Sequence, residues 1–331
     1  MNDPVPSAIA VDPILEVRDL CTVFDTPAGQ VRAVDGVSFT LGARRRLGVV
    51  GESGSGKSIA AMSILRLLDS PGRIERGEIL FRGRDLRGLS DREFLALRGR
   101  DLCLVFQDPM SALNPVYRVG RQVGEQILAH RRLSKAELRA EVVELFRQVG
   151  IPDPDRRFDE YPHNLSGGMR QRVVIAMAMA NKPDVLILDE PTTALDVTIQ
   201  AQILDVIRGL TETTVMLITH DFGVVREICD EVVVMYAGRV MEQGPLEEVT
   251  ARPRHPYTRA LLASMPGLAE RGKPLFAIPG TVPSPFDLPP GCGFAPRCTH
   301  ATARCATRPP LFAAGTGHLS ACWLQETLTN D

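Results

Sequence analysis

Apolar runs that end in small or polar residues recur along the chain and define its predicted strands. Residues 47–50, 102–106 and 185–188 are unbroken apolar runs, as expected for parallel strands that are buried on both faces. Two further runs, at 215–219 and 231–235, have similar character. With helical patterns between them, these runs predict an α/β fold with a parallel sheet.

Helical spacing marks the segments between these strands. One helix is predicted to begin at Lys57 and to continue through Leu67, and another to span residues 171–180. Residues from about 108 to 165 are also helical in pattern and form a predicted helical subdomain. One of its helices has a single apolar face, which is typical of a packed helix: Val119, Val123 and Ile127.

The two ends of the chain differ from this core. Residues 15–45 read as short antiparallel strands, and residues 77–81 as a hairpin-like segment. Beyond Gly244 prolines cluster and regular apolar periodicity fades, which predicts a loop-rich extension. We therefore divide the chain into a domain of residues 1–250 and an extension of residues 251–331.

A phosphate-binding loop, GESGSGKS, follows the first predicted parallel strand and opens the next helix. Small residues let successive backbone N–H groups converge on phosphate oxygens, and the helix N-terminus adds partial positive charge. We expect Lys57 to reach the β- and γ-phosphates and the Ser58 hydroxyl to bind Mg²⁺. The predicted nucleotide-binding residues here are Gly51, Ser53, Gly54, Ser55, Gly56, Lys57, Ser58 and Ile59.

Two acids end the strand at residues 185–188. Asp189 suits an outer contact to Mg²⁺. Glu190 points the other way on an extended chain and suits polarising the attacking water as general base. The alternative is that both acids cap the next helix. A phosphate loop in the same chain favours the catalytic interpretation.

The segment LSGGM, followed by Arg-Gln-Arg, lies between the phosphate loop and the acidic strand end. Ser166, Gly167 and Gly168 precede the helix predicted over residues 171–180, so they present a hydroxyl and N–H groups at a helix N-terminus. One chain therefore carries two phosphate-binding surfaces.

In this order, the motifs resemble those of ATPase subunits of ATP-binding-cassette (ABC) transporters, over residues from about 15 to about 244. The resemblance implies a P-loop ABC ATPase core with an antiparallel β subdomain and a helical subdomain, and it implies ATP and Mg²⁺ as ligands. It assigns Gln107 to sensing Mg²⁺ and the γ-phosphate, His220 to contacting the γ-phosphate, and Asp196 to a loop that crosses to a partner subunit.

The same resemblance concerns two more places in the chain. It implies that Ser166 and Gly168 close over ATP held by a facing ATPase subunit, so that hydrolysis requires two subunits. Phe24 matches the aromatic residue on which adenine stacks, and equally fits a core residue of the N-terminal strands.

Composition limits the classes of function. With 331 residues, 44% of them hydrophobic, the chain can build a full core. Its net charge of −2 argues against a general nucleic-acid surface. The longest apolar stretches fall far short of a membrane span, and the first residues lack the pattern of a secretion signal. We expect a cytoplasmic chain that reaches the membrane through other subunits.

Four of the seven cysteines fall in the extension with the spacing C-x₅-C-x₆-C-x₁₆-C: Cys292, Cys298, Cys305 and Cys322. A cytosolic chain disfavours disulfides, so clustered thiols indicate a metal centre. Four cysteinates suit zinc or an iron–sulfur cluster, and the spacing alone leaves the metal open. The other alternative is four unconnected thiols.

The extension resembles that of the oligopeptide/dipeptide branch of these transporters, which also includes nickel importers, through the runs HPYTRALLASMP, IPGTVPSP and GCGFAPRC. The resemblance implies a [4Fe–4S] cluster and ATP-driven import of peptides or a related small solute. It implies a complex with a second, homologous ABC ATPase, two transmembrane permease subunits and an extracytoplasmic solute-binding protein. The chain would then lie at the cytoplasmic face of the inner membrane, with Tyr117 as a candidate permease contact.

The alternative function is a soluble ABC ATPase that acts on nucleic acid or ribosomes. Such proteins usually duplicate the cassette or insert long coiled-coil or zinc-bearing segments. This chain has one cassette, a compact helical insertion and a transporter-type extension, which together favour the importer without nucleic acid as a partner.

Overall fold

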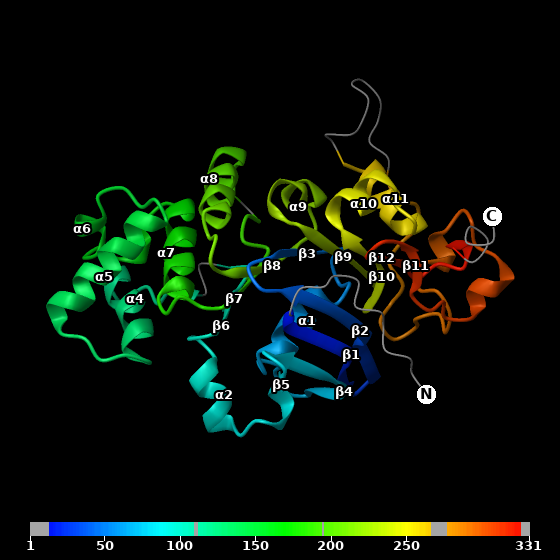
Figure 1. Ribbon diagram of the computed structural model, residues 1–331, viewed down its shortest axis with the longest axis horizontal. Coiled ribbons are helices and arrows are strands. Elements are labelled where there is room, and N and C mark those ends of the chain that lie inside the picture. The colour runs from blue at the N-terminus through cyan, green and yellow to red at the C-terminus, as the bar shows by residue number, and fades with distance from the viewer. Residues whose placement is uncertain (1–12, 109–111, 194, 266–276, 326–331) are drawn as a thin grey trace. The chain divides into compact units, whose positions relative to one another are not determined.

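The computed structural model describes residues 13–108, 112–193, 195–265 and 277–325 (Figure 1). The chain divides into two compact units. Unit 1 contains Met1–Arg87 and Leu217–Asp331, and unit 2 contains Gly88–Met216. Strand β8 (Thr214–Thr219) crosses the boundary between them. The boundary predicted after residue 250 separates the ATPase domain from the C-terminal extension, which is not the division between units 1 and 2. That boundary stays a prediction.

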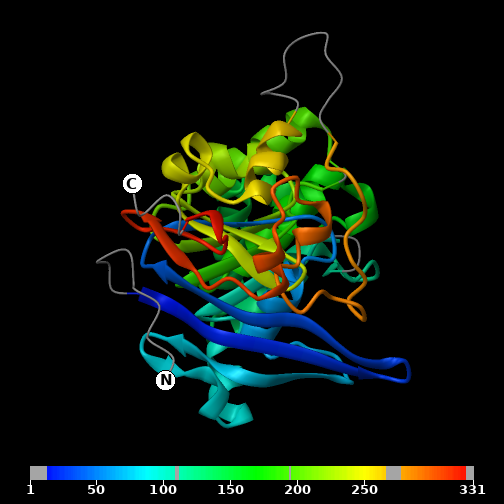
Figure 2. The same cartoon turned by 90° about the vertical axis from the view of Figure 1, so that its right-hand side faces the viewer.

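The N-terminal part of unit 1 is an antiparallel sheet with the strand order β2-β1-β4-β5. Its strands are β1 (Pro13–Thr26), β2 (Gly29–Gly42), β4 (Gly72–Phe81) and β5 (Arg84–Asp85). Figure 2 shows β1 and β2 side by side in dark blue. This confirms the antiparallel β subdomain, but the strands are longer than expected, at 14 residues each for β1 and β2. Register shifts along β1 break the period-two pattern, so the sequence shows only its shorter pieces.

The remaining strands of unit 1 form a mixed sheet with the order β11-β12-β10-β9-β3. Strands β3 (Arg46–Val50) and β9 (Glu231–Tyr236) are parallel, and β10 (Arg239–Pro245) returns antiparallel to β9. Two strands of the extension, β12 (His318–Ser320) and β11 (Phe312–Gly315), continue the sheet beyond β10 (Figure 1). They are three and four residues long, too short to show an alternating pattern, and the sequence analysis missed them.

The helices of unit 1 are short. They are α1 (Lys57–Ile64), α9 (Phe222–Ile228), α10 (Leu246–Ala251) and α11 (Pro256–Ala263), with 3-10 turns η3 (Ala295–Arg297) and η4 (Ala303–Ala306). Helix α1 begins at Lys57 as predicted but ends before Leu67. Arg66 has a φ of 50°, a left-handed conformation that cannot continue the helix.

Unit 2 contains the parallel strands β6 (Leu102–Val105) and β7 (Val185–Asp189) and most of the longer helices. The helices are α2 (Asp91–Leu97), α4 (Val119–Leu128), α5 (Lys135–Gln148), α6 (Pro154–Arg157), α7 (Gly167–Met179) and α8 (Val197–Arg208), with turns η1 (Leu86–Gly88) at the boundary and η2 (Pro162–Asn164). The apolar face predicted on α4 is fully buried, as expected for a packed helix. A capping box of Ser134 and Glu137 opens α5.

None of the helices within the described ranges combines the length and the apolar character that a membrane span requires.

Candidate functional site

The phosphate loop connects β3 to α1 in unit 1. Lys57 is buried and lies folded over the loop. Its Nζ donates to the carbonyl oxygens of Gly51 at 2.8 Å and Glu52 at 3.0 Å, and contacts the Ser55 hydroxyl at 3.2 Å. The amine is therefore held at the loop whose N–H groups are expected to receive phosphate oxygens.

Two glycines of this loop fit only because they lack a side chain. A Cβ on Gly51 would come within 2.1 Å of the carbonyl oxygen of Met235 in β9. Gly56 has a φ of 94°, and a Cβ there would lie 2.4 Å from the carbonyl oxygen of Ala33. The loop is thus backed tightly by neighbouring backbone, which fixes its path.

The acidic strand end lies in unit 2. All residues of β7 are buried, and Asp189 is its last residue. Glu190 follows in a left-handed conformation with a φ of 48°. The side chains of Gln107 and Thr193 both donate to its Oε2, at 3.1 Å and 2.7 Å. The structure therefore brings Gln107 and Glu190 together and adds Thr193, which the sequence analysis missed.

The extended backbone expected at Glu190 was wrong. The strand stops at Asp189, and the backbone turns at Glu190. A left-handed residue other than glycine is uncommon and costs free energy, which the surrounding contacts must offset.

The LSGGM segment opens α7 in unit 2. Ser166 is the N-cap residue and its hydroxyl accepts from the N–H of Met169 at 3.3 Å. Gly168 packs so closely that a Cβ would lie 2.4 Å from Ile199 of α8, whereas Gly167 is exposed. The helix begins at Gly167 and not at residue 171, so both glycines belong to its first turn. The predicted N-terminal position of Ser166 is kept.

The remaining predicted residues are distributed over both units. In unit 1, His220 is exposed directly after β8, and Phe24 is half-buried in β1 opposite Gly72. Ser58 and Ile59 lie half-buried in the first turn of α1. In unit 2, Asp196 is the N-cap of α8 and accepts from the N–H of Ile199 at 3.0 Å.

All four cysteines of the extension line one pocket, together with His255, His300 and Trp323. Burial and then the nearby thiols of Cys292, Cys298 and Cys305 raise the pKa of Cys322 to about 11, against the opposing N–H of Leu324. Burial is the main cause that also raises the pKa values of Cys292 and Cys298, and the thiol of Cys305 adds to it in both cases, against opposing backbone N–H groups. These thiols therefore lie within electrostatic reach of one another.

Across the described residues, which include all four cysteines, no three histidine, cysteine or acidic side chains are gathered as a single metal ion requires. A tetrahedral zinc ion would hold four sulfurs about 2.3 Å from one centre. In an iron–sulfur cluster each cysteine binds a different iron atom, so the sulfurs lie farther apart.

The extension also contacts the phosphate loop directly. The hydroxyl of Tyr257 in α11 accepts from the N–H of Glu52 at 2.9 Å. Arg297, which directly precedes Cys298, donates to both carboxylate oxygens of Glu52, at 2.7 Å and 3.1 Å. A lone arginine in a loop gives no sequence signal, and the sequence analysis did not find this contact.

Comparison with known proteins agrees with this geometry. The family profile "ABC transporter" matches residues 34–193, and the profile "Oligopeptide/dipeptide transporter, C-terminal region" matches residues 241–305. A solved bacterial ABC transporter cassette, MJ0796, which is described as dimeric, is 26% identical, with a TM-score of 0.64 over 70% of this chain and 98% of that chain. The fold and the phosphate loop thus define an ABC-type ATPase.

Two relatives from Bacillus subtilis narrow the family. The dipeptide transport ATP-binding protein DppD is 48% identical over 321 residues, which are 96% of both chains. The oligopeptide transport ATP-binding protein OppD is 48% identical over 322 residues, which are 96% of this chain and 90% of OppD. The chain belongs to the ATP-binding subunits of the oligopeptide/dipeptide family of ABC transporters. This confirms the predicted fold class, the family and a transport-coupled ATPase.

Proposed function

We propose that this chain hydrolyses ATP to drive the import of peptides across the cytoplasmic membrane. The observation that carries the proposal is the combination, in one chain, of an ABC cassette and the C-terminal region of oligopeptide/dipeptide transporters. The names of both B. subtilis relatives state peptide transport.

In the proposed reaction, Lys57 and the N–H groups of the phosphate loop bind the phosphates of ATP, and His220 contacts the γ-phosphate. Glu190 acts as general base on the attacking water. Support for this role comes from Gln107 and Thr193, whose bonds to one carboxylate oxygen hold the group in a fixed orientation. Phe24 is the proposed stacking partner of adenine.

Both units carry oxygen donors that suit Mg²⁺. The Ser58 hydroxyl, the Gln107 amide oxygen and the Asp189 carboxylate are hard oxygen ligands of the kind Mg²⁺ prefers. When bound, the ion would neutralise charge on the β- and γ-phosphates.

We propose that hydrolysis requires a second, homologous ABC ATPase. Ser166, Gly167 and Gly168 would then close over the ATP of the facing subunit, and Asp196 would lie in the loop that crosses to it. Val197, next to Asp196, is 83% exposed and is therefore accessible to a partner chain. The MJ0796 cassette is described as dimeric.

The proposed contacts with the permease subunits lie in unit 2. Val116 is 68% exposed, and Tyr117 and Phe106 are also exposed large hydrophobic residues. Such residues suit a helix of a permease subunit that docks against them. Two permease subunits would hold the chain at the cytoplasmic face of the inner membrane, and an extracytoplasmic solute-binding protein would deliver the peptide.

The four cysteines of the pocket are the proposed ligands of a [4Fe–4S] cluster. The donor set fits, because four thiols line one pocket. When bound, the cluster would cross-link an extension that has little regular secondary structure of its own.

The function is tested by measuring which partner stimulates ATP hydrolysis. Purified chain is assayed with the permease subunits and second ATPase in lipid vesicles, and separately with duplex DNA and with ribosomes. We expect stimulation only in the vesicles. Stimulation by DNA or ribosomes, with none by the permease, would identify a soluble ABC ATPase instead.

A further inference from the structure

Glu52 occupies a position that the phosphate-loop motif leaves unspecified. The C-terminal extension binds both its backbone and its side chain. Its N–H donates to the hydroxyl of Tyr257 at 2.9 Å, and its two carboxylate oxygens accept from Arg297 in a bidentate ion pair. Bidentate, charge-assisted pairs are among the strongest and most directional hydrogen bonds in proteins. The phosphate loop is therefore fastened to a segment more than 200 residues away along the chain.

Arg297 is itself held in place. Only 5% of its side chain is exposed. Its guanidinium also donates to the carbonyl oxygen of Pro279 at 2.8 Å and to the hydroxyl of Tyr236 at 3.1 Å. It lies over the rings of Tyr236 and Phe294, 5.8 Å and 5.9 Å from their centroids. An arginine with this many fixed partners presents its charge to Glu52 in one orientation.

The same residue, Glu52, also touches the phosphate-binding lysine. Its carbonyl oxygen accepts from Lys57 Nζ at 3.0 Å. On the other side, Gly51 lies against the backbone of Met235, so the start of the loop has little room to move. A shift of Glu52 would therefore move both its backbone N–H and the carbonyl oxygen that accepts from Lys57.

We propose that Arg297 and Tyr257 are positioning residues of the phosphate loop, through which the C-terminal extension sets the nucleotide affinity of the cassette. They act on Glu52 and do not touch the nucleotide. The inference rests on ATP binding by the cassette and is independent of the proposed cargo.

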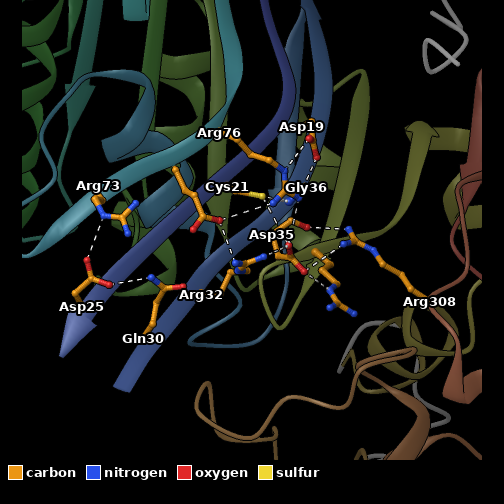
Figure 3. Close-up of polar contacts among 12 residues, drawn as sticks. Asp19, Cys21, Asp25, Gln30, Arg32, Asp35, Gly36, Arg73, Arg76 and Arg308 are labelled. Atoms are coloured by element: carbon orange, nitrogen blue, oxygen red, sulfur yellow. Dashed lines mark hydrogen bonds and ion pairs between the residues drawn. The ribbon is translucent and has the colours of Figure 1, made fainter. Parts of the chain in front are cut away.

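A different contact of the extension, with the N-terminal sheet, provides the control. Arg308 donates to the buried carboxylate of Asp35 at 3.2 Å and to its carbonyl oxygen at 2.9 Å. Figure 3 shows Arg308 directed toward Asp35, which also forms ion pairs with Arg32 and Arg76 of the sheet. Arg308→Met therefore removes a comparable anchor of the extension and leaves the contacts of Glu52 in place.

The experiment measures affinity for ATP and for ADP by calorimetry on the full chain, for Arg297→Met, Tyr257→Phe and Arg308→Met. Tyr257→Phe removes one oxygen and keeps the ring that packs against Tyr236 and Phe294. We expect both Arg297→Met and Tyr257→Phe to weaken nucleotide binding by about 5-fold or more, as is typical of coupling between linked sites. Arg308→Met should bind as the wild type does, and Arg297→Lys should recover part of the loss.

A double-mutant cycle then distinguishes positioning of Glu52 by Arg297 from a general loosening of the extension. Once Glu52→Gln is present, adding Arg297→Met should cause little further loss, because the ion pair is already gone. The proposal is overturned if Arg297→Met and Tyr257→Phe bind both nucleotides as tightly as the wild type. It is equally overturned if Arg308→Met causes the same loss, or if the effects of Glu52→Gln and Arg297→Met simply add.

Discussion

At the scale of single residues, the orientation of the proposed catalytic carboxylate is set by its hydrogen-bond partners more than by the geometry of its strand. Glu190 has a left-handed backbone, and Gln107 and Thr193 both donate to its Oε2. These contacts offset the cost of the unusual conformation and fix the orientation of the carboxylate. A group that must accept a proton from one water molecule benefits from this restriction.

Glu190→Gln tests the base directly. The amide keeps the size of the side chain but cannot accept a proton, so hydrolysis by the assembled pair should fall by about 10²–10⁴-fold while ATP affinity is retained. Phosphate release and ATP binding are measured side by side. The matched control is Glu125→Gln, an exposed residue of α4 paired with Arg121 at 2.8 Å, which should leave both unchanged. Normal turnover by Glu190→Gln would remove the base assignment.

The sequence revealed those residues whose roles depend on local pattern. Lys57 and Ser58 stand in a motif whose spacing is itself the signal, and Asp189 ends an unbroken apolar strand. Arg297 and Thr193 contact partners that only the folded chain brings near, so no sequence pattern marks them. The backbone conformation of Glu190 was predicted wrongly because a local departure from strand geometry leaves no trace in hydrophobicity.

At the scale of elements, the extension is the part whose structure was least predictable. Its strands β11 and β12 are short and join the edge of a sheet built by distant residues. The core strands, by contrast, are continuous apolar runs, and β7 matches its predicted start at residue 185. Tertiary pairing, which single-sequence periodicity does not contain, decides the short elements.

The proposed cluster is an element-scale prediction. Protein purified without oxygen should be brown and contain about four iron atoms per chain, the number expected for one [4Fe–4S] cluster. Cys298→Ser should lose the colour and loosen the extension, whereas Cys229→Ser, which changes a cysteine outside the pocket, should keep it. Iron content and protease sensitivity are the measurements. One zinc and no iron would replace the cluster by a zinc site, and no bound metal would reject the site.

At the scale of the whole molecule, the chain has two helix N-termini that we propose bind phosphate, one in each unit: that of α1 and that of α7. In the proposed pair of ATPases, each serves a different nucleotide. Binding of ATP and closure of the pair are then distinct steps, and a mutation can block closure without preventing ATP binding.

Ser166→Arg tests this separation. The large cation should block closure, so the isolated chain should bind ATP normally while the assembled complex loses hydrolysis. Ser134→Arg is the control, because Ser134 caps α5 with the same chemistry but away from the proposed interface. Calorimetry measures binding and phosphate release measures turnover. Full turnover by a strictly monomeric wild-type chain would contradict the requirement for two subunits.

The most direct measurement of the central claim is peptide uptake. Inverted or reconstituted vesicles that contain the permease subunits, the second ATPase and this chain are supplied with ATP, a solute-binding protein and labelled peptide. We predict ATP-dependent transport of peptide with the wild-type chain, and its loss with Lys57→Ala, which removes the phosphate-binding amine. Transport that continues unchanged with Lys57→Ala, or ATP hydrolysis that moves no peptide, would contradict the account.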